Sequence, residues 1–146
     1  MKIRAPRTDD EAVWRKLWTG YLEYCESSVP EAVYAATFAR LLDPARTTQQ
    51  AFLAVGDDDN PFGLVHYIYH PHNWRIEDVC YLQDLYAAPD MRRKGVGRAL
   101  IEAVYGAADA NGTPSVYWMT QDFNTEARKL YDRIATLTPF IKYQRP

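Results

Sequence analysis

The sequence predicts a single α/β domain spanning residues 1–146, and three observations lead to that class. Segments of helical periodicity alternate with apolar, strand-like runs along the chain. A basic, glycine-containing turn at residues 92–97 joins one such run to a helix-like segment. No repeat, linker or low-complexity segment interrupts the predicted order, which is β-α-α-β-β-β-α-β-α-β.

The first half of the chain predicts a short strand, two helices and a hairpin. Residues 3–5 form the strand, and Trp14, Trp18 and Tyr21 lie on one stripe of the first helix. A second helix follows the capping sequence at residues 28–31 and ends at Asp43-Pro44. Residues 51–55 and 62–69 then pair as a hairpin across the acidic turn at 56–61.

The second half predicts three strands and two helices. Residues 74–88 are apolar on both faces, which is typical of a central strand. The next helix carries a buried stripe over residues 96–108 and ends at Asn111-Gly112. A strand at 115–120, a helix capped by Asn124 and a last apolar strand at 138–143 complete the domain.

Composition excludes several functional classes. The net charge of -2 shows that the chain lacks the overall basic character of nucleic-acid-binding proteins. No apolar run approaches the roughly 20 residues that cross a bilayer. The N-terminus lacks a signal-peptide core, and Cys25 and Cys80 have apolar neighbours without metal-ligand spacing. We therefore expect a cytoplasmic protein with reduced cysteines. His70 and His72 lack a third ligand at suitable spacing, so no metal is expected.

The basic glycine turn predicts a site for a phosphate or pyrophosphate. Glycines allow close backbone approach, and the first amides of a helix lack internal partners. The spacing does not fit a P-loop, and Leu100 stands where a dinucleotide fingerprint needs its third glycine. A solvated basic loop is the alternative interpretation. The candidate residues are Arg92, Arg93, Lys94, Gly95, Val96, Gly97 and Arg98.

Three local patterns resemble motifs of the GNAT N-acetyltransferases, and their sequences are most similar to the Hpa2-like branch of that family. The patterns are Tyr81 to Pro89, then Arg92-x-x-Gly95-x-Gly97, then Asn124-x-x-Ala127-x-x-Leu130-Tyr131 after a strand with Tyr117-Trp118. The resemblance implies a mixed, mostly antiparallel sheet with helices on both faces. It also implies that the two central parallel strands, around Leu85 and Trp118, splay apart.

The resemblance further implies acetyl-CoA as cosubstrate, without a metal. Leu85, Tyr86 and Ala87 would bind the pantetheine arm, with an amide near Tyr86 polarising the thioester carbonyl. Asn124 would contact the pantetheine, although a plain helix cap also explains it. Tyr131 would protonate the leaving thiolate, or would only pack in the core.

The resemblance does not name the group that takes the amine's proton. Asp84 is the carboxylate best placed on the strand before the loop, with Glu77 and Asp78 earlier on it. Removal of the proton through waters, or an ordinary solvated carboxylate, remains open.

The predicted function is acetyl transfer from acetyl-CoA directly to a primary amine. The acceptor would be a small molecule, such as a polyamine or an amino acid-like compound, or a lysine side chain. A non-catalytic acyl-CoA-binding sensor or scaffold is the alternative. The acidic run Asp57 to Asp59 would suit a polyamine, or simply forms a hairpin turn. An exposed apolar strand at Phe140, Ile141 and Tyr143 predicts a homodimer.

Overall fold

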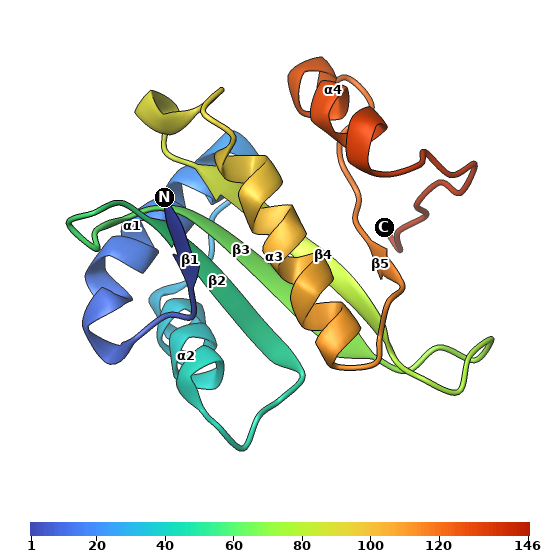
Figure 1. Cartoon of the computed structure of the whole chain (residues 1–146), viewed down its shortest axis with the longest axis horizontal. Helices are drawn as coiled ribbons and strands as arrows, with labels where there is room; N and C mark the ends of the chain where they lie inside the picture. Colours follow the sequence, from blue (N-terminus) through green and yellow to red (C-terminus); the bar gives the residue numbers. More distant parts are fainter.

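The computed structural model describes residues 1–146 as one five-stranded sheet with helices on both faces. The strands follow the order β1-β2-β3-β4-β5 across the sheet (Figure 1). Their bounds are β1 Lys2–Arg4, β2 Gln49–Val55, β3 Pro61–His70, β4 Val79–Ala87 and β5 Val116–Tyr117. The helices are α1 Glu11–Tyr24, α2 Glu31–Leu42, α3 Val96–Ala110 and α4 Thr125–Ile134, with short 3-10 turns at Thr8–Asp10 and Pro89–Met91.

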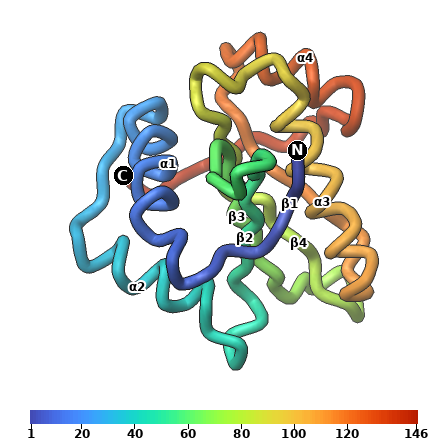
Figure 2. Tube along the Cα trace, turned by 60° about the vertical axis from the view of Figure 1, so that its left-hand side comes forward, coloured from blue at the N-terminus to red at the C-terminus, as the bar shows by residue number.

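Two apolar clusters fix the layers. Helix α3 covers one face of the sheet, where Leu100, Ile101 and Val104 are fully buried. Helices α1 and α2 cover the other face, where Trp14 and Phe38 meet Leu53 from the sheet. Figure 2 shows α1 and α2 on one side of the strands and α3 on the other. The three-layer arrangement leaves the β5 side of the sheet as an open edge.

Only one strand pair is parallel. β1, β2, β3 and β4 pair antiparallel, whereas β4 and β5 run parallel and pair only at Cys80 with Val116 and at Tyr81 with Tyr117. Beyond those pairs the chain after β5 leaves β4, which continues to Ala87. The predicted splaying of the two parallel strands therefore occurs, with β5 at the edge of the sheet.

A bulge in β4 re-aims the side chains beyond it. Asp84 pairs with His66 and Leu82 pairs with Tyr67, so Gln83 is an extra residue opposite β3. Before the bulge, Leu82 packs under α3; after it, Tyr86 packs on the α1 side. The bulge thereby places Asp84, together with His66, on the face that α1 covers.

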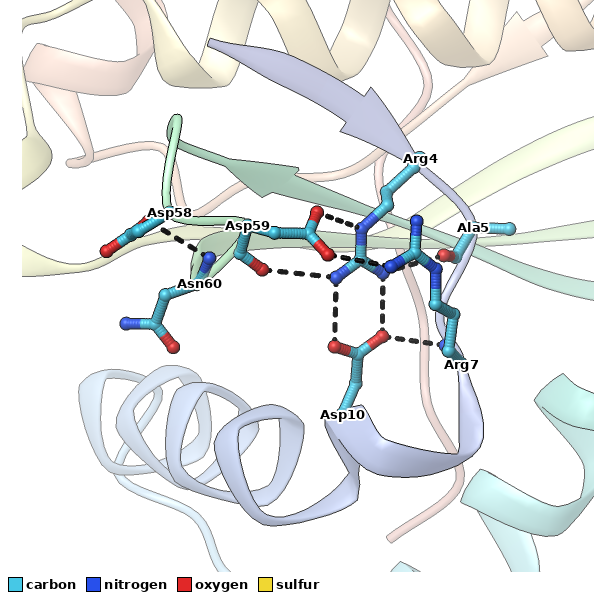
Figure 3. A network of polar contacts seen from close by, with 7 residues as sticks. All are labelled: Arg4, Ala5, Arg7, Asp10, Asp58, Asp59 and Asn60. Atoms are coloured by element: carbon cyan, nitrogen blue, oxygen red, sulfur yellow. Dashed lines mark hydrogen bonds and ion pairs between the residues drawn. The ribbon is translucent and has the colours of Figure 1, made fainter.

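An ion-pair network joins β1 to the start of α1 and to the turn between β2 and β3. The Arg4 guanidinium donates to both Asp10 oxygens, at 2.7 and 3.0 Å, and to Asp59 at 2.9 Å (Figure 3). Arg7 also donates to Asp59, at 2.7 Å. Because Asp59 is paired with two arginines, its charge is already neutralised within the protein. This favours the hairpin-turn interpretation of the acidic run over a polyamine site.

Two predicted strands are corrected. β4 begins at Val79 rather than at residue 74, because Trp74 and Ile76 point into solvent from a loop that contains Pro71. Residues 138–143 form no strand, since β5 has only two residues and offers little edge to pair with. Phe140 and Ile141 are therefore exposed. None of the helices has the length and apolar content needed to cross a bilayer.

Candidate active site

The splay between β4 and the chain after β5 opens a cleft of about 320 Å³. Its walls come from the end of α1, from β4, from residues 118–124, from α4 and from the C-terminal tail. The lining includes Tyr21, Tyr24, Cys25, Gln83, Leu85, Trp118, Asn124, Tyr131 and Lys142. Three of the predicted site residues, Leu85, Asn124 and Tyr131, therefore meet in one cavity.

The β4 edge of this cleft carries free backbone groups. The Ala88 amide donates to the Phe62 carbonyl of the neighbouring strand β3, at 2.8 Å. Because backbone groups alternate along a strand, those of Tyr86 and Asp84 also face β3, and those of Leu85 and Ala87 face the cleft. The Ala87 carbonyl accepts from Arg92 Nε at 3.3 Å, which leaves Leu85 with both groups free. The free backbone amide that faces the cleft is therefore that of Leu85, whereas the Tyr86 amide faces β3.

The basic glycine turn follows at the end of β4 and presents a row of unpaired amides. Arg93 and Gly95 have φ of 62° and 81°, and α3 begins directly after Gly95. The first amide of this region with an intramolecular partner is that of Ala99, which donates to the Gly95 carbonyl. Amides of residues 92–98 therefore remain available to an anion, as a helix start provides.

The basic side chains of the turn have different surroundings. Arg92 lies over the rings of Tyr24 and Tyr86, 5.8 and 5.5 Å from their centroids, and so borders the cleft. Arg98 pairs with Glu102 at 2.7 Å. Arg93 is 86% exposed and has only a loose partner, Glu126, at 3.9 Å. The turn and α4 thus flank the same end of the cleft.

Tyr131 lies on α4 with its ring against the edge of Trp118, at a centroid distance of 5.4 Å. No protein group hydrogen-bonds its hydroxyl, although most of the ring is enclosed. Burial, and secondarily the neighbouring Tyr24, raises the pKa of this phenol above the ordinary value of 10.0. A protonated phenol with no protein partner, in a cleft, suits a general acid.

Asn124 stands at the N-cap position of α4, but its side chain makes no capping bond. Its Nδ2 donates to Thr120 Oγ1, and its Oδ1 accepts from the Tyr24 hydroxyl, both at 3.3 Å. The plain-cap interpretation therefore fails. The amide instead links α1 to α4 across the mouth of the cleft.

Asp84 lies one layer behind the cleft, on the α1 face of the sheet. It lines a second cavity of about 340 Å³ between the sheet and helices α1 and α2. Gln83 lines both cavities, and Tyr21 lines the first. Burial, followed by the nearby Asp84 carboxylate and Cys25 thiol, raises the pKa of Tyr21. Tyr21 and Gln83 therefore separate Asp84 from the cleft between β4 and β5. The alternative carboxylates, Glu77 and Asp78, lie in the loop before β4.

Sequence reasoning missed several residues of the two cavities. His66 could have been noticed, because a histidine inside an apolar strand needs a buried partner. Gln83 owes its place to the bulge, which depends on the register with β3. Lys142 lines the cleft from the tail, and no local pattern indicates this.

Comparisons with known proteins identify the family of the chain. The acetyltransferase (GNAT) family matches residues 12–135. The D-amino-acid N-acetyltransferase HPA3 of Saccharomyces cerevisiae is 39% identical over 143 residues, covering 98% of this chain and 89% of the relative. A thialysine N-epsilon-acetyltransferase of Sus scrofa is 26% identical, covering 66% of this chain and 68% of the relative.

Solved structures share the fold. A probable acetyltransferase superposes with a TM-score of 0.85 at 23% identity, covering 100% of this chain and 97% of the other. An aminoglycoside N-acetyltransferase in complex with CoA gives a TM-score of 0.83 at 20% identity, with 99% and 93% coverage. The predicted family and its α/β fold are confirmed.

Proposed function

We propose that this chain, which belongs to the acetyltransferase (GNAT) family and is an acyltransferase, transfers an acetyl group from acetyl-CoA directly to the primary amine of a small molecule. The observation that carries the proposal is the cleft between β4 and β5. It combines a free strand edge at Leu85, a free phenol at Tyr131 and a row of unpaired amides at its end.

The cleft has a place for each part of acetyl-CoA. The pyrophosphate binds the amides of residues 93–98, with Arg93 and Lys94 supplying charge. The pantetheine arm extends the sheet along the free groups of Leu85, and the Asn124 amide contacts it from α4. The thioester carbonyl accepts from the Leu85 amide, which stabilises the oxyanion that forms there.

The reaction is a direct transfer without a covalent acyl-enzyme. The neutral acceptor nitrogen bonds to the acyl carbon, the carbon–sulfur bond breaks, and the thiolate takes a proton from Tyr131. The proton that the nitrogen loses as the amide forms restores the phenol. Asp84 takes the proton of the acceptor ammonium through a water or another hydrogen-bonded group, because Tyr21 and Gln83 lie between it and the cleft. Burial keeps Tyr131 protonated at neutral pH.

The relatives support an amine acceptor of small size. Their names describe enzymes that act on D-amino acids, thialysine and aminoglycosides. These compounds share a primary amine, so amino acids, polyamines and lysine-like amines form the acceptor class to examine first.

The test measures release of the CoA thiol from acetyl-CoA in the presence of an amine panel. The panel contains D- and L-amino acids, polyamines, an aminoglycoside and a lysine peptide. Amine-dependent thiol release, with an acetylated product seen by mass spectrometry, is the expected result. Binding of acetyl-CoA without transfer to any amine would favour the sensor or scaffold instead.

We also propose a homodimer. The tail keeps Phe140, Ile141 and Tyr143 at 78%, 79% and 90% exposure, and β5 leaves an open sheet edge. A second copy would cover both features. Light scattering at micromolar concentration is expected to give twice the 16.8 kDa chain mass, and a monomeric mass would contradict the dimer.

A further inference from the structure

A buried polar network joins α1 to the two central strands behind the cleft. Trp14 Nε1 donates to His66 Nε2 at 2.9 Å, and His66 Nδ1 lies 2.8 Å from Asp84 Oδ2. Trp18 Nε1 donates to the same Asp84 oxygen at 3.2 Å. All four residues are at most 7% exposed, so solvent does not compete for these bonds.

The hydrogen bonds determine the tautomer of His66. An indole nitrogen is only a donor, so Nε2 of His66 must accept from Trp14 and carries no proton. The ring proton therefore sits on Nδ1 and is donated to Asp84. His66 is a neutral imidazole in this arrangement, and Asp84 receives two donors on one oxygen.

No donor lies within hydrogen-bond distance of the other oxygen of Asp84, although the Tyr21 hydroxyl is near enough to interact with the carboxylate. No side-chain oxygen or nitrogen in the chain is both fully sealed and unpaired, so Oδ1 is not fully enclosed by protein. Asp84 lines the 340 Å³ cavity and is the only charged residue that does so. The network thus presents one fixed carboxylate oxygen, at a place where a proton or an ammonium group can reach it.

We propose that His66 is a positioning residue for the transfer, which rests on the function proposed above. Trp14 holds the imidazole neutral, with its proton on Nδ1, and the imidazole orients Asp84 as an anion. The free Oδ1 then accepts the proton that leaves the acceptor ammonium.

Few titratable groups face this network from the elements around it. β4 contributes Asp84 and Tyr81, and the end of α1 contributes Tyr21 with Cys25 beside it. α2 contributes Tyr34, whose hydroxyl lies 2.6 Å from Thr19 Oγ1. The guanidinium of Arg15, on α1, lies 5.4 Å from the ring centroid of Tyr34. The Trp14 bond is therefore the contact that distinguishes the two nitrogens of His66.

The first test observes the tautomer directly, in the full chain labelled with ¹⁵N-histidine. The wild-type His66 is expected to give the Nδ1–H tautomer pattern, because Nε2 accepts from Trp14. Trp14→Phe removes that donor, so His66 is expected to populate both tautomers. Trp18→Phe is the matched control, because it removes an indole donor from Asp84 and leaves His66 Nε2 occupied. A wild-type His66 that carries its proton on Nε2 would overturn the inference.

The second test compares His66→Phe with His66→Asn in the acetylation of the best amine of the panel. His66→Phe removes a donor to a buried carboxylate and is expected to lower kcat/KM by about 10- to 100-fold. The acidic limb of its pH profile moves to higher pH, since a carboxylate that loses a donor holds its proton more readily. His66→Asn keeps an N–H donor in place of Nδ1 and is expected to restore most of the rate. Acetyl-CoA affinity stays unchanged in both.

The outcomes separate this inference from the proposed function. If the wild-type protein acetylates no amine, the proposed function fails and the positioning role fails with it. If the wild type is active and both variants lose the same activity without moving the pH profile, His66 only packs. That result overturns the inference and leaves the acetyltransferase proposal intact.

Discussion

A Cβ atom on Gly20 of α1 would lie 2.5 Å from the hydroxyl oxygen of Tyr86 on β4. The missing side chain therefore gives the Tyr86 ring its place beneath α1, and Arg92 lies over that ring. Glycine inside a helix costs about 1 kcal/mol relative to alanine, so its presence here needs a packing reason. The contact links the first helix to the basic glycine turn.

Gly20→Ala is expected to displace the Tyr86 ring and, with it, Arg92. Acetyl-CoA affinity should fall by about 3- to 10-fold, the equivalent of one cation–π contact. Calorimetric titration with acetyl-CoA measures the effect. Gly106→Ala is the matched control, because Gly106 lies in α3 with no atom within 4 Å of its added Cβ. The Gly106→Ala control should gain up to about 1 kcal/mol in stability and bind acetyl-CoA normally. Equal acetyl-CoA affinities of the Gly20→Ala and Gly106→Ala variants would contradict the prediction.

Gly97→Glu tests the anion site. Gly97 is the second residue of α3, and a Cβ there would make ordinary contacts with Leu130 and Leu85, at 3.5 and 3.9 Å. The fold therefore tolerates a side chain, whereas a carboxylate beside the unpaired amides would repel a pyrophosphate. We expect acetyl-CoA binding to be lost in a folded protein. Gly97→Ala separates size from charge, and unchanged affinity in Gly97→Glu would remove the site from this turn.

Asp10→Asn tests the network that joins β1, α1 and the β2–β3 turn. The hydrogen bonds from Arg4 are the main reason that the pKa of Asp10 lies below its ordinary value. Loss of the charge should destabilise the fold by about 1–3 kcal/mol at neutral pH, the usual worth of hydrogen bonds to a charged group. Denaturant unfolding at several pH values measures it.

The pH dependence of that loss has a definite sign. A carboxyl whose pKa is lowered by folding stabilises the protein above its unfolded value, and the effect disappears as pH falls through the folded value. The difference in free energy of unfolding between the wild type and Asp10→Asn should therefore shrink below about pH 4. Asp59→Asn removes the other, exposed partner of Arg4 and should have a smaller effect. A difference that grows in acid would contradict the assignment.

Features that depend on residues close together in the sequence could be predicted from the sequence. Gly95 with φ of 81° and α3 starting after it follow from glycine chemistry. Tyr131 was singled out through the family resemblance, and it does line the cleft. The bulge at Gln83 was not predictable, because it depends on the register between β3 and β4. For the same reason the partnership of His66 with Asp84 appears only in the folded chain. The predicted last strand did not form, because the open edge that β5 offers is only two residues long.

Tyr131→Phe tests the chemistry of the transfer. The substitution keeps the ring against Trp118 but removes the proton that the thiolate would take. Turnover should fall by roughly 10²- to 10⁴-fold, the usual worth of general acid–base catalysis. Acetyl-CoA affinity should change little, because the phenol acts mainly in the transition state. Steady-state rates and calorimetric affinities from one preparation provide the comparison.

The pH profile adds a second readout for Tyr131. A general acid must be protonated, and burial raises the pKa of this phenol above 10.0. Ionisation of Tyr131 should therefore not limit the wild-type rate at or below about pH 10. Tyr143→Phe, the same chemical change on a 90% exposed ring of the tail, should leave the rate unchanged. Near wild-type turnover in Tyr131→Phe would make the residue a packing group, with water protonating the thiolate. A joint loss of stability and binding would instead show that the hydroxyl supports the fold of α4.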